Sequence, residues 1–243
     1  MKAGGPEQRD LLQAPCLVPS ASTRNAMRAA GDPNTDYRDL VRRGYDRCAE
    51  AYAAARRRDD GDQLAPLLGL LQDGSRVLDL GCGAGVPIAR TLAERHHVTG
   101  VDASRRMLDL AGVAVPEARL IHRDILDVEF ESDSFDAAVA MFVLFHLPRE
   151  EHGEVFQRVS SWVRPGGYLL ATLNEFAEAP YTEDDFFGVR MYWSSLSWPE
   201  YERLLGNAGF AIQGGKIIGH GYGRKHKGRD ERHPMVLARR VPG

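Results

Sequence analysis

The chain has 243 residues, of which 43% are hydrophobic and 27% are charged, and its formal net charge is −3 at pH 7. The longest apolar run, residues 137–145, is too short to cross a membrane, and the charge balance offers no general attraction for nucleic acid. These values argue against a membrane protein and against a protein that binds polyanions through its overall charge.

The three cysteines show no paired spacing, and the apolar stretch near the N-terminus is not followed by a cleavage-type pattern. We therefore expect reduced thiols, a cytoplasmic location, no membrane or nucleic-acid partner, and a monomer or homodimer.

The first 58 residues fall into two parts. Residues 1–35 mix Gly, Pro, Ser and Asn without a sustained period, which predicts a flexible tail with a short helix near 23–30. Residues 36–58 place apolar side chains at spacings of three and four, which predicts a helix that Gly44 divides in two.

Short apolar runs then alternate with helical segments. The runs at 76–80, 97–102, 118–122, 135–143 and 167–173 predict strands buried on both faces, and 87–95, 104–113 and 149–163 predict the helices between them. A helix at 198–210 and two closing strands, 211–220 and 233–240, complete the pattern, while 174–197 follows no period and is predicted to be irregular. Alternating strands and helices are typical of an α/β fold with a doubly wound, mostly parallel sheet.

The stretch VLDLGCGAGVP, residues 77–87, follows the first of these strands with glycines at 81, 83 and 85. Glycines in the first strand-to-helix turn let a ligand touch the main chain, although close packing of the helix on the sheet is an alternative explanation. A dinucleotide fingerprint requires Gly or Ala where this chain has Val86, which disfavours a nicotinamide-dependent reductase. Asp79 before the glycines suits a positively charged ligand instead.

Two further carboxylates follow the next strands. Asp102 ends the second strand, where it could accept both hydroxyls of a ribose, and Asp124 follows the third strand beside Ile125, where the pair could hold an adenine. The predicted ligand is therefore a small cationic nucleoside.

With these motifs in their order and spacing, the chain resembles the class I S-adenosylmethionine-dependent methyltransferases. The resemblance rests on VLDLGCGAG, VTGVDAS, HRDILDVEF, FDAAVAMFVLFHLP and VRPGGYLLATL, and it covers residues 36–240. It implies a Rossmann-like seven-stranded sheet whose last strand is antiparallel, in a methyltransferase domain at 36–243. It also implies a helical lid at 36–58, and the segment 174–197 becomes an insert on the substrate side.

The resemblance further implies S-adenosyl-L-methionine as cofactor and S-adenosyl-L-homocysteine as product. The residues that it assigns to the cofactor are Tyr45, Asp79, Gly81, Cys82, Gly83, Gly85, Asp102, Ala103, Met107, Asp124, Ile125, Met141 and Phe142. The reaction would be an in-line displacement in which the protein mainly aligns the reactants.

The sequence identifies the residues that would contact the methyl acceptor less specifically. His146, after the fourth strand, is a candidate general base, or else a histidine hydrogen-bonded beneath the lid. The other candidates for substrate contact are Tyr52, Asn174, Glu175, Tyr192 and Trp193, whose aromatic members favour an apolar or planar acceptor. The predicted function is methyl transfer to O, N or C of a small molecule, with a specialised metabolite as the expected acceptor.

Other functions stay open at this point. A protein of this fold can bind the cofactor without transferring a methyl group and serve as a cyclase, regulator or scaffold. An RNA methyltransferase is disfavoured because no D/N-P-P-Y signature follows the fourth strand. The histidines of the loop at 219–232 and the adjoining His233 lack the spacing of metal ligands, and no metal site is expected.

Overall fold

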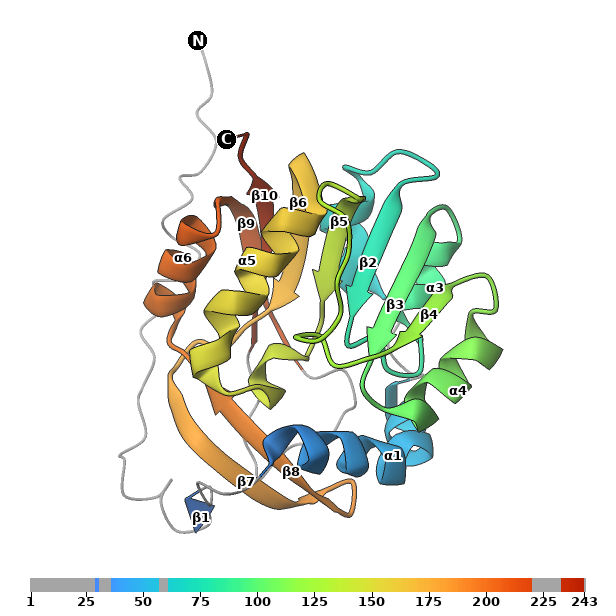
Figure 1. The fold of residues 1–243 in the computed structure, drawn as a ribbon, viewed down its shortest axis with the longest axis vertical. Helices are drawn as coiled ribbons and strands as arrows, with labels where there is room; N and C mark the ends of the chain where they lie inside the picture. Colours follow the sequence, from blue (N-terminus) through green and yellow to red (C-terminus); the bar gives the residue numbers. More distant parts are fainter. Residues whose placement is uncertain (1–28, 31–35, 57–60, 220–232, 243) are drawn as a thin grey trace.

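The computed structural model describes residues 29–30, 36–56, 61–219 and 233–242 (Figure 1). Its strands are β1 (Ala29–Ala30), β2 (Arg76–Leu80), β3 (His97–Asp102), β4 (Arg119–His122), β5 (Phe135–Ala140), β6 (Val163–Thr172), β7 (Glu178–Phe186), β8 (Val189–Ser195), β9 (Phe210–Ile218) and β10 (His233–Arg240). Its α-helices are α1 (Tyr37–Arg56), α2 (Ala65–Leu68), α3 (Ile88–Ala93), α4 (Arg105–Ala114), α5 (His152–Trp162) and α6 (Trp198–Asn207). The 3₁₀ helices within these described ranges are η4 (Asp62–Leu64), η5 (Leu144–His146) and η6 (Arg149–Glu151).

The main sheet has seven strands in the order β4-β3-β2-β5-β6-β10-β9. The pairs from β4 to β6 are parallel, and β10 runs antiparallel to both of its neighbours. The chain reverses its direction of winding between β2 and β5, so the carboxyl ends of β2, β3 and β5 border the crevice where ligands bind in such sheets. The predicted doubly wound, Rossmann-like fold is confirmed.

The central strands β2 and β5 are buried on both faces, which explains why they read as continuous apolar runs. Neighbouring residues of β2 show the alternation: Val77 joins the core beneath α2 and α3, and Leu78 joins the core beneath α5 and α6. Figure 1 shows α5 and α6 over one face of the sheet, with α1 crossing below its carboxyl edge. The sheet is therefore a rigid frame that presents its carboxyl edge to α1.

The helix α1 is continuous, and the prediction that Gly44 divides it is wrong. A β-carbon at Gly44 would lie 2.9 Å from Met191 Cε and 3.3 Å from the carbonyl oxygen of Arg190. The glycine thus lets α1 approach β8 closely, because the absence of a side chain creates the space that Met191 fills.

The segment 174–197 is not irregular, as its sequence suggested. It forms the antiparallel hairpin of β7 and β8, and β1 adds a third strand to make a small second sheet. The predicted short helix near 23–30 lies mostly outside the described residues, and its last two, Ala29 and Ala30, form β1. The aromatic residues of this segment did not reveal the hairpin because its strand pairing contains two register irregularities.

Candidate active site

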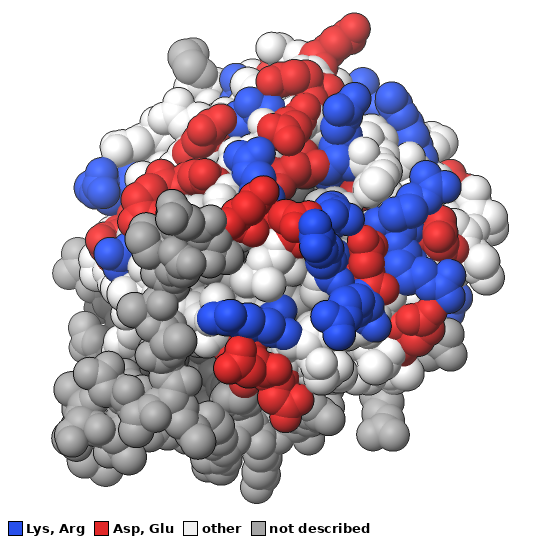
Figure 2. Space-filling model, turned by 60° about the horizontal axis from the view of Figure 1, so that its bottom comes forward, with Lys and Arg blue, Asp and Glu red and all other residues white. Residues whose placement is uncertain are grey.

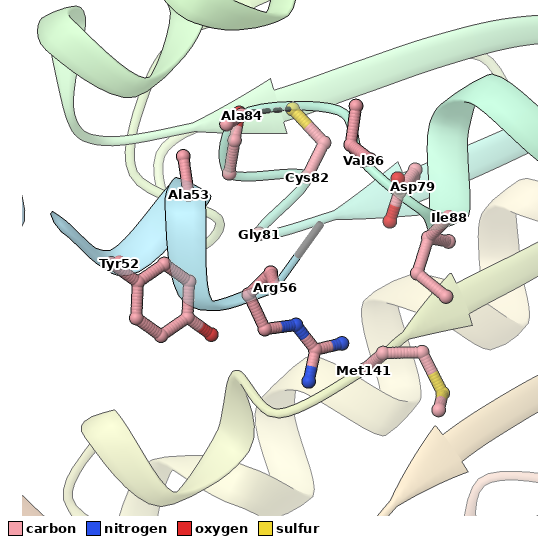
Figure 3. A pocket seen from close by; sticks show the side chains of 11 residues that line it. Tyr52, Ala53, Arg56, Asp79, Gly81, Cys82, Ala84, Val86, Ile88 and Met141 are labelled. Atoms are coloured by element: carbon pink, nitrogen blue, oxygen red, sulfur yellow. Dashed lines mark hydrogen bonds between the residues drawn. The ribbon is translucent and has the colours of Figure 1, made fainter. Parts of the chain in front are cut away.

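A pocket lies at the carboxyl end of β2, between the glycine turn and α1 (Figure 3). Its volume is about 420 Å³ when its opening to solvent is included. The residues that line it are Tyr52, Ala53, Arg56, Asp79, Gly81, Cys82, Gly83, Ala84, Val86, Ile88 and Met141. The sequence-predicted Asp79, Gly81, Cys82, Gly83, Met141 and Tyr52 are therefore brought together around one cavity.

The three glycines of the turn lack a side chain for different physical reasons. All three have positive φ angles, but a β-carbon at Gly81 would lie 2.5 Å from Val143 Cγ2, and one at Gly85 would lie 3.1 Å from Val115 Cγ2. A β-carbon at Gly83 would meet no atom within 4 Å. Gly81 and Gly85 thus permit close packing, whereas the main chain at Gly83 borders open space that a ligand can approach.

Asp79 is a buried carboxylate at the pocket wall. Its side chain is 1% exposed, and its Oδ2 atom has no hydrogen-bond partner among the described residues. Burial, with the nearby charge of Asp102 as the smaller cause, raises the pKa of Asp79 to about 8. A cationic group in the pocket would supply both the missing hydrogen bond and the missing counter-charge.

Asp102, at the end of β3, has its carboxylate held from both sides. The backbone N–H of Gly83 donates to Oδ2 at 2.8 Å, and the backbone N–H of Ser104 donates to Oδ1 at 2.8 Å. Burial raises the pKa of Asp102 to about 6, while the two N–H donors act in the opposite direction. Because a carboxylate oxygen can accept two hydrogen bonds, each oxygen still has capacity for a hydroxyl donor.

The helix α1 closes the site and is tied to α4 by polar contacts. Asp46 Oδ1 accepts from Ser104 Oγ at 2.7 Å and from the backbone N–H of Arg106 at 3.2 Å, and Glu50 pairs with the Arg106 side chain. Arg42 lies between Asp39 and Asp46 in two ion pairs on the same helix. Figure 2, in which the lower side of Figure 1 is turned forward, shows basic and acidic side chains intermixed on this face.

His146 is buried beneath α1 and makes two hydrogen bonds. Its Nδ1 lies 3.0 Å from the carbonyl oxygen of Tyr192, and its Nε2 lies 2.7 Å from the Tyr45 hydroxyl. A carbonyl only accepts, so Nδ1 carries the proton and Nε2 accepts the Tyr45 O–H. Burial lowers the pKa of His146 to about 4, which keeps the ring neutral near pH 7.

Aromatic rings surround His146. Its ring centroid lies 4.5 Å from that of Trp193 and 5.2 Å from that of Tyr45, and Phe186 lies 5.3 Å from Trp193. The buried Trp193 Nε1 atom has no hydrogen-bond partner among the described residues. We name Tyr45, Tyr52, Phe145, His146, Phe186 and Trp193 the aromatic cluster.

The structure places Tyr192 and Trp193, neighbours on β8, on opposite faces of that strand. The Tyr192 ring packs 5.4 Å from that of Tyr37, away from the aromatic cluster, and only its carbonyl group contacts His146. Asn174 and Glu175 follow β6 and do not line the pocket; the Glu175 carbonyl accepts from the backbone N–H of Trp198.

The remaining predicted cofactor residues lie around the pocket without lining it. Met107 is buried beneath α1 with Ala84, and the Ala103 carbonyl accepts a hydrogen bond from His122. The Ile125 side chain is part of the core, and Asp124 Oδ1 accepts the backbone N–H of Leu126 at 2.9 Å. Phe142 lies under the guanidinium of Arg56, whose Cζ is 4.8 Å from the ring centroid.

Sequence reasoning missed Arg56 as a site residue. It is 5% exposed and lines the pocket, although it begins a run of three arginines, residues 56–58, which by itself is typical of a solvated surface. The available signal was helical spacing, because Arg56 follows Tyr52 by four residues and so lies on the same face of α1. Figure 3 shows both side chains directed to the same cavity.

Within the described residues, no group of three or more metal-ligating side chains is assembled, and no helix has the length and apolarity needed to cross a membrane. Of the loop at 219–232, residues 220–232 lie outside the described part of the chain.

The architecture is that of the Rossmann-like methyltransferase fold: a sheet with one antiparallel strand, a glycine turn after the first parallel strand, and carboxylates at the ends of the first two. Residues 77–167 match the family described as "Methyltransferase domain". The resemblance to the class I S-adenosylmethionine-dependent methyltransferases that the sequence predicts is confirmed over this stretch.

Several known proteins are similar to this chain. A ubiquinone biosynthesis O-methyltransferase of Paracidovorax citrulli is 33% identical over 125 residues, which cover 49% of this chain and 50% of that protein. The chain spans about half the length of the curated relatives it matches.

Two solved structures share the fold. The first is Burkholderia thailandensis 1,6-didemethyltoxoflavin-N1-methyltransferase, with bound 1,6-didemethyltoxoflavin and S-adenosylhomocysteine. It has a TM-score of 0.66 at 21% identity, covering 90% of this chain and 97% of that one. The second, the [4+2]-cyclase SpnF, has a TM-score of 0.56 at 21% identity, covering 75% and 81%.

Proposed function

We propose that this protein transfers a methyl group from S-adenosylmethionine to O, N or C of a small, uncharged, planar molecule of the specialised-metabolite class. The observation that carries the proposal is the unpartnered, buried Asp79 carboxylate beside the glycine turn, with the anchored Asp102 on the next strand.

The pocket fits the two ends of the cofactor's amino acid part. In our assignment the ammonium group binds Asp79, and Arg56, on the opposing helix, binds the carboxylate. A zwitterion is matched by two opposite charges, each of which is costly to bury alone. The open main chain at Gly83 and the carboxylate of Asp102 would hold the sugar.

When bound, S-adenosylmethionine supplies a methyl group that its sulfonium already activates. The protein's part is to align the acceptor, which alone is worth about 7–11 kcal/mol. In our proposal α1 and the β7–β8 hairpin exclude water, and Met141 with the Tyr52 ring lies between the cofactor pocket and the rest of the aromatic cluster.

The aromatic cluster supports a flat, uncharged acceptor. His146 is neutral near pH 7, and burial raises the pKa of Tyr52 and of Cys48 beneath it, so these groups carry no charge there. A buried indole N–H normally finds a partner, and Trp193 would donate to an oxygen or nitrogen of the acceptor.

His146 is proposed to position Tyr45 rather than to remove a proton from the acceptor. Its Nε2 already accepts the Tyr45 hydroxyl, and its lowered pKa makes it a weak base. This role suits a reaction that alignment drives, because a base is needed only where the acceptor must lose a proton.

The first test is isothermal titration with S-adenosylhomocysteine. We expect binding in the micromolar range, and replacement of Asp102 by Ala should weaken it by about 1–3 kcal/mol, as expected for lost charge-assisted hydrogen bonds. No binding at millimolar concentration would refute the cofactor half of the proposal.

The second test is transfer from methyl-labelled S-adenosylmethionine into a metabolite extract, read by mass spectrometry. A labelled product supports methyl transfer to a small molecule and identifies the acceptor. Tight S-adenosylhomocysteine binding with no labelled product would instead favour a cyclase, regulator or scaffold.

A further inference from the structure

The carboxylate of Asp102 is connected to the lid helix by a chain of hydrogen bonds through Ser104. The Ser104 backbone N–H donates to Asp102 Oδ1, and the Ser104 Oγ–H donates to Asp46 Oδ1 on α1. The two distances are 2.8 Å and 2.7 Å, so one residue contacts the site on one side and the lid on the other.

Ser104 has little freedom to make other contacts. It is 1% exposed and is the N-cap of α4, where its Oγ also accepts the backbone N–H of Met107 at 3.1 Å. The hydroxyl hydrogen needs an acceptor inside the protein because water barely reaches it. Asp46 is that acceptor.

Asp46 itself is held in place. Its Oδ1 also accepts the backbone N–H of Arg106, and its Oδ2 pairs with Arg42 at 3.1 Å. Its carboxylate therefore joins the middle of α1 to the first turn of α4, next to the strand end that carries Asp102.

We propose that Asp46 is a positioning residue for cofactor binding: through Ser104 it fixes the Asp102 carboxylate in the orientation that accepts the ribose hydroxyls. The docking of α1 on α4 and the binding of the ribose are then coupled. The inference rests on the proposed function, since it assumes that Asp102 holds the ribose.

These contacts predict what happens when the Asp46 carboxylate is removed. Without an acceptor at position 46, the Ser104 hydroxyl and the Arg106 backbone N–H both lose their partner on α1. The first turn of α4 then loses its anchor to the lid, and the Ser104 backbone N–H that orients Asp102 Oδ1 can move with that turn. Gly83 still holds Oδ2, so the carboxylate stays in the site but rotates about a single anchor. Ribose recognition should weaken while the contacts at Asp79 and Arg56 remain.

The experiment compares two ligands, S-adenosylhomocysteine and its 2′-deoxy analogue, by titration calorimetry. The wild-type protein should prefer the ribose form by about 10- to 100-fold, the range for one charge-assisted hydrogen bond. In Asp46→Ala this preference should fall below about threefold, with much less change in affinity for the deoxy ligand. A defect of the lid alone would weaken both ligands equally and leave the preference intact.

Two further variants test whether the effect comes from the oxygen acceptor at position 46 or from its charge, and whether any contact between α1 and α4 has the same effect. Asp46→Asn keeps an oxygen acceptor for Ser104 and should retain most of the preference, although it lacks the charge. Glu50→Ala is the matched control, because Glu50 also links α1 to α4 through Arg106 but does not contact Ser104; its preference should equal that of the wild type.

The outcomes are distinct. An unchanged preference in Asp46→Ala, or an equal loss in Glu50→Ala, overturns the role of Asp46. Absence of S-adenosylhomocysteine binding in the wild type overturns the proposed function itself. Should Asp46→Ala fold poorly, Ser104→Ala breaks the same chain and must show the same loss of preference.

Discussion

The protonation of Asp79 should control cofactor affinity. Its pKa of about 8 means that the carboxylate is mostly protonated in the empty pocket at pH 7, whereas a bound ammonium group favours the ionised form. Only the ionised fraction is competent, and that fraction falls from about one half at pH 8 to about 1% at pH 6. The titration of Asp79 by itself should therefore lower the affinity for S-adenosylhomocysteine about 50-fold over this range, or by about 2.3 kcal/mol.

The assay is titration calorimetry at pH 6, 7 and 8, in two buffers of different ionisation enthalpy. At pH 7 binding should release about 0.9 proton. Replacement of Asp79 by Asn should abolish this release and leave at most about a twofold pH dependence, due to Asp102 with its pKa of about 6. A wild-type affinity that varies less than threefold between pH 6 and pH 8 would refute the reasoning.

The same pKa has a consequence for the ligand-free protein. Because it is raised above the ordinary value of 3.8, the contribution of Asp79 to the free energy of unfolding is full below pH 4 and is lost as the pH rises through 8. The free energy of unfolding of the wild type, relative to that of Asp79→Asn, should therefore decrease as the pH rises through 8.

Three other predictions concern the turn, the buried histidine and the pocket arginine. Gly81→Ala should lower the free energy of unfolding by about 2–4 kcal/mol in denaturant titration, because its β-carbon overlaps Val143 and its φ is positive. The control Gly74→Ala has a similar φ and no neighbour within 4 Å, so it should cost only about 1 kcal/mol; equal losses would contradict the packing argument. Nitrogen-detected NMR of His146 should show a proton on Nδ1 and no titration above about pH 5, and a midpoint near 6.5 would show that the ring is not buried as described. Arg56→Gln should weaken S-adenosylhomocysteine binding by about 1–3 kcal/mol but leave the affinity for its decarboxylated analogue unchanged, and equal losses would place the carboxylate elsewhere.

The central sheet was predictable because its strands are buried on both faces, and the strands at 76–80 and 97–102 match the structure at both ends. The glycine turn and the two carboxylates were predictable for a related reason: parallel strands bring their carboxyl ends to one edge. Local pattern and global topology agree in this part of the chain.

The lid side was less predictable, because it depends on contacts between distant segments. Gly44 suggested a helix break, yet its role is set by Met191, a residue of a hairpin that the sequence did not reveal. Arg56 looked like part of a solvated basic run, and only the fold places it beside Asp79. Among the glycines, nothing local distinguishes Gly83, which borders the cavity, from Gly85, which packs against α4.

The position of α1 has a consequence for how the protein folds. This helix precedes the sheet in the chain, yet Tyr45 finds its partner His146 101 residues later, and Gly44 packs against a still later strand. Contacts of such long sequence separation form late, since loop closure must come first, and the segments that dock last are often the first to open in the native state. We therefore expect the slowest-exchanging amide hydrogens in the central strands and faster exchange in α1. Undocking of α1 would then open the pocket for release of the product nucleoside, and the same motion would reverse the last step of folding.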